Sequence, residues 1–436
     1  MNSSRIERNQ ALKSNAILTG FAGLYTLAAL CITAFSLYLT VILHWQGAFR
    51  DLWEFVDDIE KQFQGIWSAS YLLDAYGGAH RIFFPKLLFF ADYYWFGGRN
   101  ALTTTIALLC QFGYGLLIWR ATRWQSFIAS ERILVISLFI LALFSTTQVS
   151  NFLYAMDVQW YMSNFLGLIG LYVLAYYKDN AKKWLLVLLF GSAAALCNFT
   201  GIMPLFIAVL TLLIQHNRKP LHYGLLITIG IICFFYIHND KNSANVVIGA
   251  LMLSDNLETT FRIINNTLID MAIYVPRYLS SPLSRTWPIA GGALAIIGIA
   301  VTAFNWLRLF HNNIALTPWQ KLCLFISTGI IVSAIFTAFG RVIYPNSAIA
   351  ERYQTLVLPW LPSLFGLLWS DLRNTNFRTV FLGVWTITFA YYFLPAQPVS
   401  AKSMVVLSSR IQQAHTAARA GVLEPPYILA TLSHPC

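Results

Sequence analysis

The sequence contains two adjacent acids, Asp57 and Asp58, shortly after its first long apolar run. A carboxylate near a membrane surface can act as a general base, because it can take the proton of a hydroxyl group as that group attacks a substrate. Of two adjacent acids, one can act as the base while the other positions a metal ion or a donor phosphate. The alternative is the capped start of a helix, where acids stabilise the helix dipole. Residue types alone favour that alternative.

Two arginines, Arg341 and Arg352, frame a short segment between two apolar runs. Arginine at the edge of a membrane is unfavourable without a partner, so both residues point to an anionic ligand. They could hold a phosphate or pyrophosphate leaving group and stabilise the charge that develops on it. Glu351 allows a different interpretation, an ion pair between two helices. We expect the phosphate site, with Glu351 and Tyr353 beside the substrate.

The stretch GGAHRIFFPKLLFFADYYWFGG, residues 77–98, has about the length of a membrane span but carries several charges and a proline. Each charge would cost about 2.5–3.5 kcal/mol near the centre of a bilayer. We therefore expect a helix that lies in the outer membrane interface, with Pro85 in its first turn. Arg81 and Lys86 could then hold a lipid phosphate, with His80 beside the substrate. Both could equally anchor the helix among lipid headgroups.

Residues 148–164 join two apolar runs and carry four polar side chains that we expect at the outer membrane edge. Asp157 and Gln159 are assigned to the hydroxyl groups of a sugar. For Asn151 and Asn164 the favoured interpretation is structural, because asparagine is a common cap of helical turns.

The composition indicates the class of protein. Hydrophobic residues make up 57% of the 436 residues, charged residues make up 11%, and the mean hydropathy is +0.60. A soluble domain cannot bury that much apolar surface, so we expect an all-α polytopic membrane protein. Five of the six cysteines fall inside apolar runs without the spacing of metal ligands or disulfides, and no metal site is assigned.

Apolar runs of about 18 residues or more can cross the hydrocarbon layer of a membrane as helices. The sequence predicts about eleven such spans, at residues 15–44, 101–120, 132–148, 159–177, 184–197, 199–215, 221–238, 287–308, 321–340, 353–370 and 377–394. The fifth and sixth are short and meet at Asn198, so they are either two spans or one broken re-entrant unit. Asn198 and Thr200 could line a lipid groove there or stand in an ordinary turn.

The distribution of charge tests this layout. With the N-terminus inside, the whole formal charge of +11 falls on the inner connections, because bases and acids balance in the outer segments. This agrees with the positive-inside rule and predicts a cytoplasmic N-terminus and an outer C-terminus. The basic balance therefore reports membrane topology, and no nucleic-acid partner is expected.

We expect one transmembrane domain over residues 1–394, followed by a short outer tail at 395–436. The tail has helical periodicity over residues 408–423 and nothing in it indicates catalysis. A large outer loop is predicted at 239–286.

The first outer loop, residues 45–100, should carry two interfacial helices. Apolar residues recur at helical spacing from Ile59 to Leu73, which predicts a short amphipathic helix that begins near Asp58. The second helix is the aromatic stretch described above, which should end at the Gly97-Gly98 pair.

The segment A-H-R-I-x-x-P-K-L-x-x-x-A-D-x-x-x-F-G-G-R-N, residues 79–100, resembles a set of multi-pass bacterial inner-membrane proteins with the layout of GT-C glycosyltransferases. The Gln159-Trp160 pair, the acids after the first span and the later arginines fit the same resemblance. GT-C enzymes are integral membrane proteins that use a polyprenyl-phosphate-linked sugar. The resemblance implies a GT-C-like fold with Asp57 or Asp58 as the catalytic base, although Asp51 stays open as a candidate. It also implies a donor-phosphate site formed by Arg341, Arg352, Arg81 and Lys86.

By this resemblance the chain is a bacterial inner-membrane glycosyltransferase, moving a hexose or pentose from a polyprenyl-phosphate donor to a periplasmic acceptor. The acceptor would be a surface glycan such as O-antigen, a lipid or a protein, and membrane lipids are further partners. No cofactor is assigned, although a divalent cation could assist. The alternatives are a flippase for lipid-linked oligosaccharides, which would need polar residues along several spans, and an O-antigen polymerase or ligase. A non-enzymatic scaffold would leave the acid pair and the arginine pair unexplained.

Overall fold

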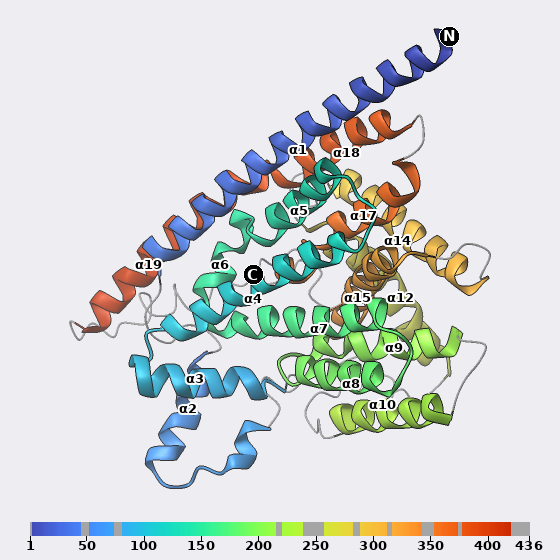
Figure 1. The fold of residues 1–436 in the computed structure, drawn as a ribbon. Coiled ribbons are helices and arrows are strands. Elements are labelled where there is room, and N and C mark those ends of the chain that lie inside the picture. The colour runs from blue at the N-terminus through green and yellow to red at the C-terminus, as the bar shows by residue number, and fades with distance from the viewer. Residues whose placement is uncertain are drawn as a thin grey trace.

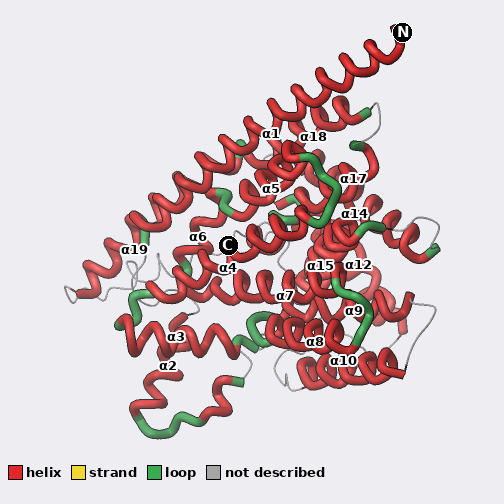
Figure 2. The backbone as a smooth tube through the Cα atoms, in the orientation of Figure 1, coloured by secondary structure: helices red, strands yellow, loops and turns green. Residues whose placement is uncertain are grey.

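The computed structural model describes residues 2–44, 52–73, 81–214, 220–238, 257–281, 288–311, 316–341, 353–373 and 377–419. Every regular element in these ranges is a helix (Figures 1 and 2), which confirms the all-α prediction. The first half comprises α1 (Asn2–Ile42), α2 (Leu52–Phe63), η1 (Ala69–Leu72), α3 (Phe83–Phe96), α4 (Ala101–Arg123), α5 (Ala129–Leu143), η2 (Thr146–Gln148), α6 (Val149–Leu153), η3 (Ala155–Asp157), α7 (Val158–Tyr176), α8 (Ala181–Ala195), η4 (Phe199–Ile202) and α9 (Met203–Ile214). The second half comprises α10 (Pro220–His238), α12 (Leu257–Leu279), α14 (Pro288–Phe310), α15 (Pro318–Arg341), α16 (Gln354–Val357), α17 (Trp360–Leu372), α18 (Arg378–Phe393) and α19 (Ala396–Arg419).

Eight helical stretches in the described part of the chain are long and apolar enough to cross a membrane. They coincide with eight of the predicted spans, as expected for a polytopic membrane protein. The other three predictions fall on α8, α9 and α10, whose described apolar stretches are shorter. α8 and α9 have 15 and 12 residues, so each is well short of the ~30 Å hydrocarbon layer at ~1.5 Å per residue.

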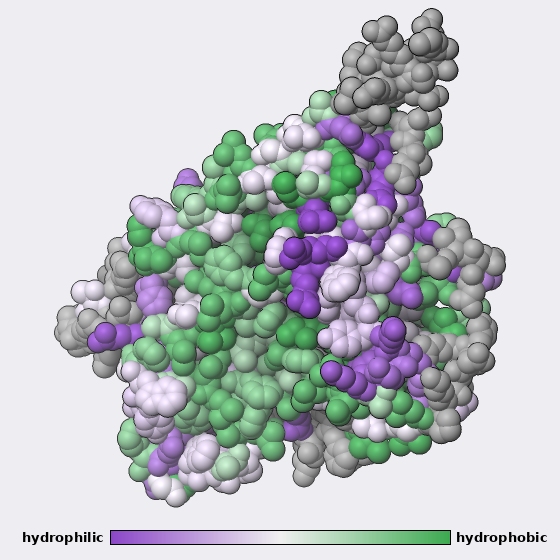
Figure 3. All heavy atoms as spheres, in the orientation of Figure 1, coloured by the Kyte–Doolittle hydropathy of each residue, from purple (hydrophilic) through white to green (hydrophobic). Residues whose placement is uncertain are grey.

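The connections between helices meet at two opposite ends of the bundle. At the end that we call inner, Arg373 after α17 donates to the carbonyl oxygen of Ser126 between α4 and α5. At the outer end, the backbone N–H of Phe84 in α3 donates to the carbonyl oxygen of Leu196 after α8. Figure 3 shows hydrophobic atoms over most of the face formed by α3 to α8, with hydrophilic atoms gathered toward the side where α4 passes to α5. In each of these two cases, the contact joins connections that were predicted on the same side of the membrane.

Polar contacts hold the inner end of α17 against its neighbours. Asp371 forms an ion pair with Arg308 at the end of α14. Asp371 also accepts a hydrogen bond of 2.9 Å from the side-chain amide of Gln320 in α15, whose oxygen accepts in turn from the backbone N–H of Thr317. Gln320 is thus a buried glutamine with both of its amide atoms engaged.

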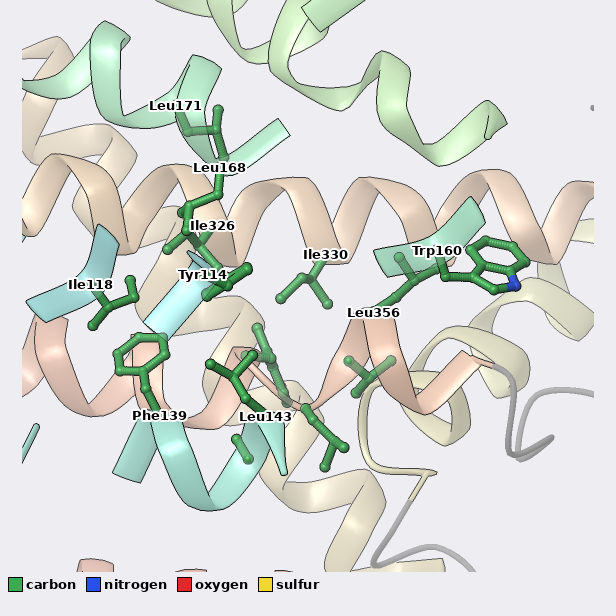
Figure 4. Close-up of a cluster of buried hydrophobic side chains, with 14 of the residues drawn as sticks. Tyr114, Ile118, Phe139, Leu143, Trp160, Leu168, Leu171, Ile326, Ile330 and Leu356 are labelled. Atoms are coloured by element: carbon green, nitrogen blue, oxygen red, sulfur yellow. The ribbon is translucent and has the colours of Figure 1, made fainter. Parts of the chain in front are cut away.

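The core of the bundle is apolar and lies between α4, α5, α7, α15 and α16. Such a core is held by close packing of side chains, since lipid tails are as apolar as the side chains themselves. Figure 4 shows these side chains converging from the five helices. Those that it labels are Tyr114, Ile118, Phe139, Leu143, Trp160, Leu168, Leu171, Ile326, Ile330 and Leu356.

Glycines let α8, η4 and α9 fold into a tight hairpin. A Cβ atom at Gly191 in α8 would overlap the side chain of Leu205 in α9. A Cβ atom at Gly201 in η4 would overlap the backbone carbonyl group of Ala194. The ambiguous region at residues 184–215 is therefore a pair of short helices packed side by side around a single turn of 3₁₀ helix.

The first interfacial helix differs from its prediction. α2 begins at Leu52 and ends at Phe63, and Gly65 follows with a φ of 71° that favours glycine. Asp57 and Asp58 are therefore in the middle of a helix, and the interpretation of the pair as a helix cap is wrong. The apolar residues from Ile66 to Leu73 belong to an irregular segment and η1. The prediction extended the helix over them because the spacing of apolar residues continues across the break at Gly65.

The second helix agrees with its prediction. α3 has Pro85 in its first turn, and Gly97 caps its end in the left-handed conformation, with a φ of 66°. With 14 residues, or about 21 Å, it is too short to cross a bilayer.

Two helices were not predicted at their observed extents. α12 lies within the predicted outer loop 239–286 and packs against α14 and α15. α19 begins at Ala396, twelve residues before the predicted helix, and lies beside η2. Its Gln397 donates to the Ser145 hydroxyl at 2.8 Å and accepts from the backbone N–H of Thr146 at 2.7 Å.

Candidate functional site

Aromatic packing fixes the orientation of α2 on α3. Phe55 and Ile59, one helical turn apart, are both buried, and the ring of Phe55 lies 5.2 Å from that of Phe89 and 4.7 Å from that of Phe90. Successive residues of a helix point about 100° apart. With Phe55 and Ile59 on α3, Asp58 is directed toward α3, whereas Asp57 is directed away from it.

The two acids consequently have different surroundings. The Asp58 side chain is 15% exposed, and its carboxylate lies 3.6 Å from the ammonium of Lys86 in α3. The Asp57 side chain is 62% exposed and forms an ion pair of 2.6 Å with Lys61, one turn along α2. The hydrogen bond to Asp57 raises the pKa of the Lys61 ammonium above its ordinary value. Asp58, rather than Asp57, is therefore the acid that meets a second element of the predicted site.

Lys86 is almost completely buried, which is unfavourable for an ammonium group unless its charge and its donors are satisfied. Its Nζ atom donates a hydrogen bond of 2.6 Å to the carbonyl oxygen of Tyr71 in η1. Arg81, just before α3, donates to the carbonyl oxygen of Leu73 at 2.6 Å. The structure thus brings Asp58, Lys86 and Arg81 together around residues 71–73.

The turn between α3 and α4 is held by Asp92, which is buried at the end of α3. Its two carboxylate oxygens accept hydrogen bonds of 2.7 Å from the backbone N–H groups of Asn100 and Leu102. These N–H groups belong to the start of α4, where a negative charge is also favourable to the helix dipole. The fixed turn holds α3, and with it Lys86, against the bundle.

We expect Asp92→Ala to lower the free energy of unfolding by about 3 kcal/mol, because one buried and one partly buried N–H group lose a charged acceptor. Thermal unfolding of the purified protein in detergent measures the effect. Asp92→Asn keeps the shape and one acceptor oxygen, so it should give an intermediate loss. Equal stability of Asp92→Ala and the natural chain would contradict this role.

A second group of polar side chains is buried at the outer end of the bundle. Segments that are distant in sequence meet there: residues 148–164, the turn at Asn198 and the start of α16. The Asn198 amide donates to the Gln159 side-chain oxygen at 2.8 Å. Asp157 accepts from the indole N–H of Trp160 at 3.2 Å, and the Trp160 ring packs edge-on against Tyr353. Three residues that the sequence assigned to the substrate, Asp157, Gln159 and Tyr353, thus lie in one connected group.

Asn151 and Asn164 do not cap helical turns, contrary to their favoured interpretation. Both amides donate to Thr355, Asn151 to its hydroxyl at 2.8 Å and Asn164 to its carbonyl oxygen at 2.9 Å. The Thr355 hydroxyl donates in turn to Gln148 at 2.6 Å. Gln148 and Thr355 were not among the residues predicted from the sequence. Each is a polar residue at the end of an apolar run, and this sequence feature does not indicate which residue it contacts.

One contact joins the two groups. The hydrogen bond from Phe84 to Leu196 lies two residues before Lys86 on one side and two residues before Asn198 on the other. The group around Asp58 and the group around Asn198 are therefore neighbours at the outer end.

Four further predicted site residues lie at or just beyond the ends of described segments. Arg341 is the last residue of α15, which agrees with its predicted place at the end of a span. His80, Glu351 and Arg352 lie outside the described residues.

Two hollows border these groups. An apolar groove of about 440 Å³ lies between α2, α3 and the start of α4. A smaller cavity of about 60 Å³ lies among α4, α7, α9 and α15, mostly apolar, with Ser163, Asn164, Thr200 and Ser333 as its polar lining. No cluster of three or more His, Cys, Asp or Glu side chains suited to a metal ion occurs in the part of the chain that the structure describes.

A scan against protein-family models, a search of curated proteins and a search of solved structures each found no match for this chain.

Proposed function

We propose that this chain is an inner-membrane glycosyltransferase of the GT-C type, which moves a sugar from a polyprenyl-phosphate donor to an acceptor on the outer side of a bacterial inner membrane. The observation that carries the proposal is the 3.6 Å contact between Asp58 and Lys86. The sequence assigned a base to the first position and a phosphate ligand to the second, on separate elements. A base and a phosphate-binding cation must both reach the same reacting sugar, and this contact supports that arrangement.

In the proposed reaction the oxygen of an acceptor hydroxyl attacks the anomeric carbon of the donor sugar. Asp58 takes the hydroxyl proton as the new carbon–oxygen bond forms. The bond from the anomeric carbon to the phosphate oxygen breaks, and the phosphate leaves with the electron pair. Because the hydroxyl attacks from the face opposite the phosphate, the configuration at the anomeric carbon inverts. The proposed cationic ligands of that phosphate are Lys86, Arg81, Arg341 and Arg352.

The proposal includes a GT-C-like layout, the cytoplasmic N-terminus and the outer C-terminal tail. The apolar groove beside α3 has the lining that the isoprenoid part of a lipid donor requires. The rival function, transport of a lipid-linked oligosaccharide, would need a wide polar path through the spans. The cavity among α4, α7, α9 and α15 is small and mostly apolar, which favours transfer over transport.

The test compares cells that carry the chain, cells that lack it, and cells that carry Arg352→Ala at equal protein level. Mass analysis of surface glycans, membrane lipids and periplasmic proteins should find one sugar mass increment that requires the natural chain. Arg352→Ala should lose most of it, because the leaving phosphate loses a cationic ligand. Identical mass profiles with and without the chain would reject the function.

A further inference from the structure

Two buried glutamines at the outer end have side-chain atoms that form no hydrogen bond within the described structure. Gln354, the first residue of α16, is fully buried, and neither its Nε2 nor its Oε1 atom has a partner there. The Nε2 atom of Gln148, also fully buried, is in the same condition. Buried polar groups in proteins are almost always hydrogen-bonded, and each one left unpaired destabilises the fold.

The orientation of the Gln148 amide follows from its neighbours. The Thr355 hydroxyl accepts a hydrogen bond from the Asn151 amide, so its own hydrogen is donated to Gln148. The Tyr161 hydroxyl also donates to the same Gln148 atom, at 3.2 Å. An atom that accepts from two hydroxyls has to be the oxygen, so the Gln148 NH₂ group is the part left over. The network therefore fixes the position of the Gln148 NH₂ group, and no atom of the described residues accepts a hydrogen bond from it.

The character of these groups limits their ligand. A glutamine amide donates through nitrogen and accepts through oxygen without carrying charge, and a hydroxyl group on a ligand can serve both atoms. The residue before Gln354 is Tyr353, whose ring packs against those of Trp160 and Tyr278. Aromatic rings offer an apolar face with a polar edge beside these amides. Amides and aromatic rings together suit a molecule that has several hydroxyl groups and an apolar ring face.

We propose that the amides of Gln354 and Gln148 bind hydroxyl groups of the transferred sugar. This inference rests on the proposed function and names the part of the donor that the outer polar group receives. A site built to hydrogen-bond a substrate hydroxyl holds buried polar groups that are unpaired when the substrate is absent. Buried amides without a partner in the part of the chain that the structure describes are the expected sign of such a site.

The first test uses the opposite signs of two effects. Gln354→Leu removes an amide that has no hydrogen-bonding partner among the described residues, so we expect Tm in detergent to rise by about 2 °C. The same change should lower sugar transfer in cells by about tenfold or more, because the sugar loses a hydrogen-bonding partner. If Gln354 instead stabilised the fold, Gln354→Leu would lower Tm. The matched control is Gln320→Leu at the inner end, which removes an amide with two partners and should lower Tm.

The second test measures binding without transfer. Methyl glucoside, methyl galactoside, methyl mannoside and methyl xyloside are each added at about 100 mM to the purified protein. At least one should raise the Tm of the natural chain by about 1–3 °C, because a ligand that binds only the folded state stabilises it. The same glycoside should leave the Tm of Gln354→Leu unchanged. Absence of any shift in the natural chain, or an equal shift in the variant, would overturn the inference.

These outcomes separate the inference from the proposed function. A sugar mass increment that depends on the chain but survives in Gln354→Leu would reject the sugar subsite and leave the transferase standing. A glycoside-dependent Tm shift that is lost in Gln354→Leu, without any chain-dependent increment, would reject the transferase and leave a sugar-binding site.

Discussion

Asp58→Asn is expected to lower sugar transfer by about 10²–10⁴-fold, the usual contribution of a general base. Asparagine keeps the shape of the side chain but cannot take the proton of the attacking hydroxyl. Asp58 is the acid that faces Lys86 and is mostly shielded from solvent. Both acids lie near Lys61 of their own helix, but within the described residues only Asp58 also forms an ion pair with α3. Asp57 is exposed, so Asp57→Asn should retain most of the activity.

The measurement is the sugar mass increment per unit of membrane-inserted protein, followed over time in cells. Thermal unfolding of each variant in detergent shows whether the fold is kept, and Asp57→Asn is the matched control on the same helix. If Asp57→Asn abolished transfer and Asp58→Asn did not, the base would be Asp57 and the orientation of α2 would carry no functional meaning. Full activity in both variants would remove the acid pair from the mechanism.

Gly201→Ala is expected to lower the free energy of unfolding by about 3 kcal/mol or more. The added methyl group would overlap the carbonyl group of Ala194 in the last turn of α8. Overpacking in a core usually costs about 1–3 kcal/mol when side chains can shift. Here the obstacle is backbone, and the same turn holds the hydrogen bond from the Gly201 N–H to the Asn198 carbonyl oxygen, so little relaxation is available.

Size-exclusion chromatography and thermal unfolding in detergent measure this loss. Gly383→Ala in α18 is the matched control, because a Cβ atom there meets nothing within 4 Å. It should leave stability unchanged or slightly higher, since alanine favours a helix over glycine. A Gly201→Ala protein as stable as the Gly383→Ala protein would mean that η4 moves freely relative to α8.

Much of the fold could be predicted because its signals are local. A run of apolar residues marks a span, and the Gly97-Gly98 pair marked the end of α3 correctly. The first interfacial helix was predicted too late in the chain, because the helical spacing of apolar residues continues past Gly65, where α2 has already ended. α12 escaped prediction because its polar residues resemble those of a loop, while its buried face, with Tyr274 and Tyr278, lies against α15.

The candidate site was predictable residue by residue but not as an arrangement. Asp157, Gln159 and Tyr353 could be selected as polar or aromatic residues at the ends of apolar runs. Nothing local to residue 159 indicates that its partner is Asn198, because that contact depends on how α7 packs on the α8–α9 hairpin. The Gln354 amide, which has no hydrogen-bonding partner within the described ranges, could not be predicted at all, because the lack of a partner leaves no sequence pattern.

The contact between α19 and η2 has a consequence for how the protein is made. Thr146 and its partner Gln397 are 251 residues apart in the chain. At a synthesis rate of about 5–20 residues per second, roughly 13–50 s separate the emergence of the two. During this interval the backbone N–H of Thr146 has to be satisfied by water or by the insertion machinery. This corner of the bundle is therefore completed only after α19 has been synthesised.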